Sequence, residues 1–217
     1  MSKECEEPVM SGGPLTSEYC LEDVHFHWAR NNNNKGCEHE IDGKRFDVEI
    51  HMVHRRKECA TNAEARNRVD GLCVLGVLVE VVQGVTSSPF LQHLMTSTQH
   101  ARYKGEEYED SEKKFNPYAI LEDGELWKEY YTYEGCVTGP PFPECVRWIV
   151  FDKHIQVSRE DLESLRNVFS VKNEPNVSSY YDAFMRGNEC IVKETPKIGD
   201  NYMKCRNLSG RVVEKSF

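Results

Sequence analysis

The longest apolar run of this 217-residue chain, Leu72 to Val82 (LCVLGVLVEVV), is interrupted only by Glu80 and constrains the fold most strongly. It is much shorter than the roughly 20 residues that a helix needs to cross a bilayer, so it predicts a buried β-strand. A second apolar segment, Cys145 to Phe151 (CVRWIVF), predicts another such strand. Both segments are expected to be buried on both faces of a sheet.

Two further segments predict neighbouring antiparallel strands. Tyr19 to Trp28 (YCLEDVHFHW) is rich in alternating, β-branched and aromatic residues and follows a turn sequence at Gly12 to Pro14. Arg45 to His54 (RFDVEIHMVH) alternates polar and apolar residues. The stretch between the two is polar and contains Asn31 to Asn34 and Asp42-Gly43, which favours an antiparallel pair.

Helices are expected to be fewer and peripheral. Ser88 to Ala101 has apolar residues at helical spacing. Ser158 to Phe169 begins with a capping-box pattern, Ser158 and Asp161, and places Leu162, Leu165 and Phe169 on one stripe. No internal repeat or linker is visible. We therefore expect one domain over residues 1–217, mostly β with peripheral helices (α+β).

Composition excludes several classes of partner. With 27 Lys and Arg against 36 Asp and Glu, the net charge is −9, so the chain has no global attraction to nucleic acid or to an anionic membrane. The amino-terminal residues, MSKECEEPVM, do not resemble a signal peptide. The nine cysteines form no CxxC pair, and we expect reduced thiols in a cytoplasmic protein.

The residues that carry chemistry are histidines on the two neighbouring strands. In His25-Phe26-His27, the two imidazoles are two residues apart and point to one face of the strand. His51 lies on the other strand, with Glu49 on the same face to accept a ring N–H. Three neutral histidines suit zinc and leave a fourth position for water. From spacing alone, a buried His51–Glu49 pair without metal is an equal alternative.

Five ordered blocks of the chain, together with its ending, resemble the α-class carbonic anhydrases, whose fold has a large, mainly antiparallel central sheet. The blocks are GGPL at Gly12 to Leu15, VHFHW at Val24 to Trp28, EHEIDGK at Glu38 to Lys44, EIHMVH at Glu49 to His54, and TYEGCVTGPPFPECVRWIVF at Thr132 to Phe151, and the ending is DNYMKCRNLSGRVVEKSF.

The resemblance implies a zinc enzyme that interconverts carbon dioxide and bicarbonate. His25, His27 and His51 match the zinc ligands, and zinc-bound hydroxide attacks CO2 in that family. Thr138 matches the threonine that orients this hydroxide, and Glu38 matches the glutamate that accepts the proton of the threonine. The expected partner is the small-molecule substrate alone, and the expected state is a monomer. The alternative is a related protein with impaired catalysis that acts through zinc binding or interaction.

Other positions match supporting roles in the same family. Glu49 matches the partner of His51, and Asp23 stands where a glutamine usually supports the first ligand. Gly139 replaces a hydroxyl residue beside Thr138 and widens the pocket. The apolar wall for CO2 is matched by Val53, Val74, Val137 and Trp148, and buried hydrogen-bonding positions by Tyr133, His39 and His54.

The main departure from the family lies at the front of the chain. The Gly12–Leu15 block normally lies well inside the domain, so about the first quarter of the usual domain is expected to be absent. That segment usually carries the histidine that shuttles protons, and no histidine of this chain is assigned to that role. The strand with His25 and His27 is also expected to become an edge of the sheet.

Overall fold

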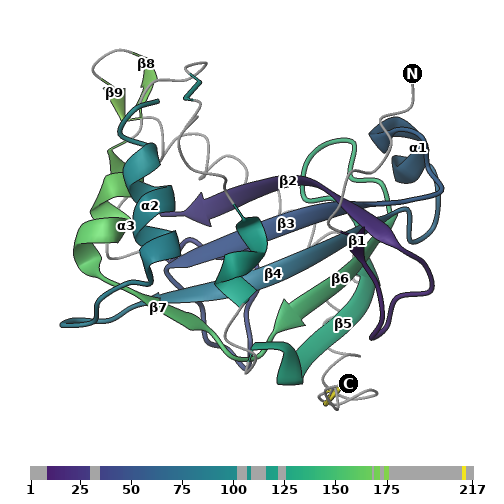
Figure 1. The fold of residues 1–217 in the computed structure, drawn as a ribbon, viewed down its shortest axis with the longest axis horizontal. Coiled ribbons are helices and arrows are strands. Elements are labelled where there is room, and N and C mark those ends of the chain that lie inside the picture. The colour runs from purple at the N-terminus through teal and green to yellow at the C-terminus, as the bar shows by residue number, and fades with distance from the viewer. Residues whose placement is uncertain are drawn as a thin grey trace.

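A curved sheet runs through the protein, with long strands side by side at its centre (Figure 1). The structure is a computed structural model and describes residues 9–29, 35–101, 107–108, 116–121, 126–167, 169–171, 174–175 and 212–213. In these residues the sheet has eight strands in the order β1-β2-β3-β4-β6-β5-β10, with β7 also paired to β4. The strands are β1 (Val9–Met10), β2 (Tyr19–Trp28), β3 (Val48–Arg56), β4 (Leu72–Val81), β5 (Glu129–Gly135), β6 (Val146–Phe151), β7 (Ile155–Val157) and β10 (Val212–Val213).

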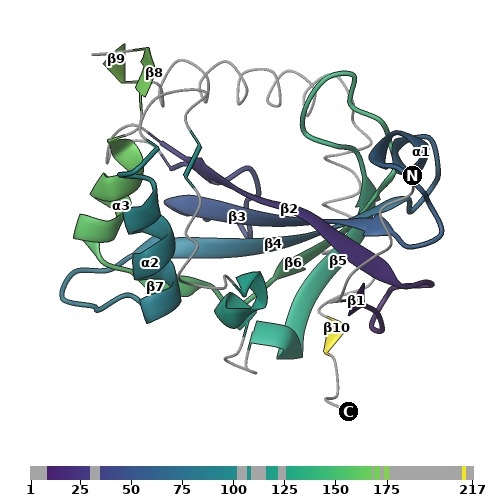
Figure 2. The ribbon, with the colours of Figure 1, turned by 45° about the horizontal axis from the view of Figure 1, so that its top comes forward.

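Most neighbouring strands run antiparallel, but β4 pairs in parallel with both β6 and β7. The mostly β fold class with a mainly antiparallel sheet is therefore confirmed. The helical elements are α1 (Asn62–Arg66), α2 (Pro89–Ser97), α3 (Arg159–Arg166) and the short 3-10 helices η1 (Pro117–Leu121) and η2 (Leu126–Lys128), and a separate two-stranded pair is formed by β8 (Phe169–Val171) and β9 (Glu174–Pro175). Figure 2 shows α2 and α3 together at one end of the sheet and α1 at the other.

The strand predictions agree closely with these bounds, with one exception. Residues 19–28 form β2, and the two apolar segments form β4 and β6. The strand expected from Arg45 begins only at Val48. Asp47 lies just outside the strand, where its carboxylate accepts hydrogen bonds from Lys35 Nζ at 2.7 Å and from the backbone N–H of Val81 at 2.9 Å.

Both predicted helices are present, but each is shorter than the sequence predicted. Ser158 caps α3, since its hydroxyl accepts a hydrogen bond from the Asp161 N–H at 3.1 Å. Leu162 and Leu165 are buried as predicted, but Phe169 lies in β8, so its assignment to the same helical stripe was wrong. The helix predicted to reach Ala101 ends at Ser97.

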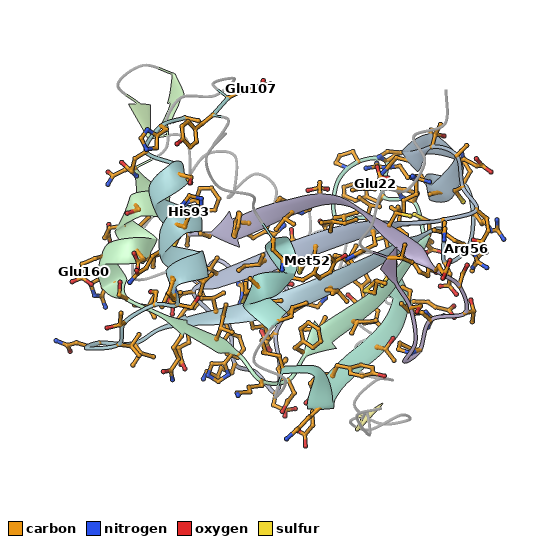
Figure 3. The ribbon with its side chains drawn as sticks, in the orientation of Figure 1. Glu22, Met52, Arg56, His93, Glu107 and Glu160 are labelled. Carbon is orange, nitrogen blue, oxygen red and sulfur yellow. The ribbon has the colours of Figure 1, made fainter. Side chains whose placement is uncertain are left out.

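The strand register divides the sheet into two faces, because directly paired residues share a face. One face, here called the core face, packs against α2, α3 and η1 and carries Met52, Leu75 and Ile149. The labelled Met52 lies on the side covered by η1 (Figure 3). The other face, here called the histidine face, carries His51. It also carries Val74 and Trp148, which pair with each other in the row next to His51.

The helices and the cysteines bear on two expectations, the absence of a membrane span and the presence of reduced thiols. No helix in the described residues is long and apolar enough to span a membrane. Buried free thiols are present at Cys37, Cys59, Cys73, Cys136 and Cys145. Cys20 is disulfide-bonded, so the expectation of reduced thiols was wrong for this residue.

Candidate metal centre

The register of β2 against β3 brings the predicted histidines together. His25 is directly paired with His51, and His27 is paired with Glu49. One ring nitrogen of each of the three histidines lies within 4.8 Å of the others. The predicted antiparallel pairing of these two strands is confirmed, and the register that places His25 opposite His51 is a finding of the structure.

The closest ring nitrogens suit a metal ion. His27 Nε2 and His51 Nδ1 are 3.1 Å apart. Two nitrogens bound to tetrahedral zinc at about 2.0–2.1 Å would be about 3.3 Å apart. Two imidazole lone pairs at this distance repel each other unless a proton or a cation lies between them.

A carboxylate faces the far side of each imidazole. His25 Nδ1 lies 2.8 Å from Asp23 Oδ1, and His51 Nε2 lies 2.7 Å from Glu49 Oε1. His27 Nδ1 lies 3.5 Å from Glu38 Oε1. Because a carboxylate accepts only, the ring N–H groups of His25 and His51 are directed toward Asp23 and Glu49, which leaves the other ring nitrogen of each histidine with a lone pair for a metal.

Burial keeps two of these histidines neutral, as metal ligands must be. Burial, followed by the neighbouring His51 and His25, lowers the pKa of His27 well below its ordinary value of 6.5. Burial also lowers the pKa of His51, against the opposing effect of Glu49. Neutral imidazoles with inward lone pairs are the donor set that zinc prefers, so these residues fit that ion.

Glu49 is the most strongly held of the three carboxylates. Its Oε1 accepts from His51 and from His39 Nδ1, the latter at 2.5 Å, and its Oε2 accepts from the backbone N–H groups of Glu38 and His39 at 2.8 Å each. His39 Nε2 in turn accepts from the Tyr133 hydroxyl at 2.6 Å. Burial alone would raise the pKa of Glu49, but the adjacent His39 and His51 hold it well below its ordinary value.

Gly76 was not singled out from the sequence. Gly76 lies on β4 and pairs with His51 of β3. A Cβ at position 76 would lie 3.2 Å from Glu49 Oε1. A glycine inside an otherwise apolar strand is the available signal, since it often marks a close approach of another group.

The residues predicted to form an apolar wall lie beside the histidines. Val53, Val74 and Trp148 are direct neighbours across β3, β4 and β6, in the row next to His51. Val137 packs against the same buried cluster.

The predicted Thr138–Glu38 relay is not present as a hydrogen bond in this structure. In the described residues, no hydrogen bond joins the Thr138 hydroxyl to the Glu38 carboxylate. Thr138 and Gly139 lie in the turn after β5, where Gly139 accepts a hydrogen bond from the Phe142 N–H at 2.9 Å. The relay stays a prediction.

Comparison with known proteins identifies the family. The family model described as eukaryotic-type carbonic anhydrase matches residues 1–217. The chain is 32% identical to carbonic anhydrase 7 of Mus musculus, over 98% of this chain and 70% of that protein. It is 35% identical to carbonic anhydrase 1 of Mus musculus (97% and 71%) and 30% identical to carbonic anhydrase 3 of Rattus norvegicus (98% and 71%). The chain therefore belongs to the eukaryotic-type carbonic anhydrase family.

Proposed function

We propose that this chain catalyses the reversible hydration of carbon dioxide to bicarbonate and a proton, with zinc held by His25, His27 and His51. The observation that carries the proposal is the set of three inward ring nitrogens, each with a carboxylate behind it. When bound at such a site, zinc makes water acidic enough to supply hydroxide near neutral pH.

The surrounding residues have proposed roles in orientation and in binding CO2. Glu49 and Asp23 each accept a ring N–H and so fix the tautomer of one histidine, and Glu38 lies 3.5 Å from His27 Nδ1. Thr138 is proposed to orient the attacking oxygen, with Glu38 accepting the proton of the Thr138 hydroxyl. The relay requires that the Thr138–Glu38 hydrogen bond form when metal and substrate are present, since catalytic hydrogen bonds often tighten only in the working complex.

An apolar wall suits CO2, which carries no net charge and needs no strong hydrogen bond. We propose that the wall consists of Val53, Val74, Val137, Trp148 and Gly139. Trp148 and Val74 are 2% and 4% exposed, so their packing against Val53 and Val137 gives the wall a rigid backing.

The proton is proposed to leave through buffer, because no histidine outside the cluster is assigned as a shuttle. The side chain of His25 is 42% exposed, so solvent reaches this edge of the site. Hydration activity should therefore rise with the concentration of an imidazole buffer until another step limits the rate.

The test combines stopped-flow CO2 hydration with measurement of zinc content. We expect about one zinc per chain, hydration activity, and loss of both in His51→Ala. A Glu134→Gln control, which alters an exposed carboxylate on β5, should keep both. Stoichiometric zinc without hydration, even in concentrated buffer, would favour the alternative of a related protein that binds zinc without catalysis. A folded chain that takes up no zinc would contradict both.

A cytoplasmic monomer is also part of the proposal. The buried free thiols support a reducing compartment, whereas the bonded Cys20 does not. Cell fractionation tests the compartment, and light scattering of the purified chain tests the oligomeric state.

A further inference from the structure

We propose that the negative charge of Asp23, the carboxylate that accepts the ring N–H of His25, makes metal retention depend on ionic strength. The inference rests on the proposed metal site and concerns how that site keeps its ion. It predicts that zinc affinity depends on salt through Asp23, whereas the buried carboxylate Glu49 confers no such dependence.

An irregularity in β2 sets up the position of Asp23. Leu21 pairs with His54 on the core face, whereas Asp23 pairs with Val53 on the histidine face, so Glu22 is an additional, bulged residue. The bulge shifts the alternation of side chains by one residue. Leu21 therefore points to the core face, whereas Asp23 and His25, further along the same strand, point to the histidine face.

The bulge is held in place from the neighbouring strand. The Glu22 carboxylate accepts a hydrogen bond from Arg55 Nε at 2.6 Å, and the Arg55 side chain is only 6% exposed. Glu22 lies at the end of β2 nearest α1 (Figure 3). Because this ion pair fixes the residue directly before Asp23, the Asp23 carboxylate starts from a defined backbone position.

Asp23 can orient His25 and stabilise it electrostatically. Its Oδ1 lies 2.8 Å from His25 Nδ1, so it accepts the ring N–H and leaves Nε2 as the available lone pair. A carboxylate in this position also attracts a divalent cation on the far side of the ring. An amide could accept the same hydrogen bond but would lack the charge.

Solvent exposure separates Asp23 from the other two carboxylates. The side chain of Asp23 is 53% exposed, compared with 3% for Glu38 and 0% for Glu49. Dissolved ions screen exposed charges strongly and buried charges weakly, and the screening length falls from about 10 Å at 0.1 M salt to about 3 Å at 1 M. The Asp23 contribution should therefore fade with salt.

The experiment measures the zinc dissociation constant by competition with a chelator, for the full chain at 0.1 M and 1 M sodium chloride. We expect Asp23→Asn to weaken zinc binding about tenfold at 0.1 M salt. Replacing a residue that holds a metal ligand typically weakens metal binding by about 10- to 100-fold, and the lower value applies here because the charge of Asp23 is exposed to solvent. At 1 M salt the ratio of the two constants should fall toward one. Asp23→Glu should restore most of the affinity.

Glu18→Gln is the matched control, because Glu18 is 55% exposed and lies just before β2 but pairs with Lys57. It should leave the zinc dissociation constant unchanged. Glu49→Gln should weaken binding by a factor that changes little with salt. Equal affinities of the wild type and Asp23→Asn at 0.1 M, or a difference that persists undiminished at 1 M, would overturn the inference. Failure of the wild type itself to bind zinc would instead refute the proposed metal site.

Discussion

Glu49 shows how much a single buried side chain can organise. Both of its oxygens are fully used, by two imidazole N–H groups and two backbone N–H groups. Each of these donors favours the ionised carboxylate, which explains why its pKa stays low although the side chain is 0% exposed. The residue thereby fixes the tautomer of His51 and the path of the backbone at residues 38–39.

Replacing Glu49 with glutamine should weaken zinc binding by about 10- to 100-fold. The amide brings an NH2 group, with two N–H donors, among groups that are themselves donors, and it leaves His51 without a charged acceptor. Chelator competition measures the effect, and circular dichroism shows whether the variant is folded. A folded Glu49→Gln chain with wild-type zinc affinity would contradict the assigned role.

His54 should make stability depend on pH. Burial lowers the pKa of His54 to about 4, and its Nε2 lies 2.8 Å from the Tyr118 hydroxyl on the core face. The unfolded chain binds this proton near pH 6.5 and the folded chain only near pH 4, so stability is lost as the pH falls through this range. The loss attributable to His54 approaches about 3 kcal/mol at the acid end.

Urea denaturation of the wild type and of His54→Gln between pH 7 and pH 4 measures this contribution. The variant should lose less stability over the range, since glutamine does not titrate. Parallel curves for the two proteins would show that His54 is not the responsible group.

Among the secondary structure elements, α3 is capped at its amino-terminal end by the side chain of Ser158. Ser158 accepts from the Asp161 N–H, and the Ser158 hydroxyl donates to the Asp161 carboxylate at 2.7 Å. The helix then buries Leu162 and Leu165 against the core face. Local sequence is enough to specify the start of this helix, because the cap satisfies backbone donors within its first turn.

Ser158→Ala should lower the free energy of unfolding by about 1 kcal/mol, the usual cost of removing a helix cap. Ser158→Thr keeps a hydroxyl at the same position and should lose much less. Chemical denaturation of the zinc-loaded protein measures both changes. A loss of equal size in the two variants would point to packing at residue 158 rather than to capping.

Within the sheet, β2 is the element with the least support from neighbouring strands. In the described residues, β1 pairs with Tyr19 and Cys20 only, and no other strand is paired with the outer side of β2. This agrees with the expectation that the strand of His25 and His27 lies at an edge. Since His25 is also the most exposed ligand candidate, this edge is where loss of metal should begin.

For the whole molecule, zinc binding should stabilise the fold, because the three ligand candidates join β2 to β3 across the sheet. At a free zinc concentration 100 times the dissociation constant, the gain is about 2.7 kcal/mol. Thermal melts with zinc and with a chelator should therefore differ. His51→Ala should remove that difference, and a melting temperature that does not respond to zinc in the wild type would count against the proposed site.

Sequence patterns by themselves determined the main strands, the cap of α3 and the candidate ligands, because alternation and capping act between residues close in the chain. Only the tertiary structure decided that His25 pairs with His51, that Gly76 makes room for Glu49, and that Glu38 lies nearest to His27. These arrangements depend on strand register and on contacts between segments distant in sequence, which no local pattern encodes. The three histidines could be found by reading the chain, and so could Glu49, which lies two residues from His51 on the same strand. Glu38 comes from a different segment, so it meets His27 only when the chain is folded.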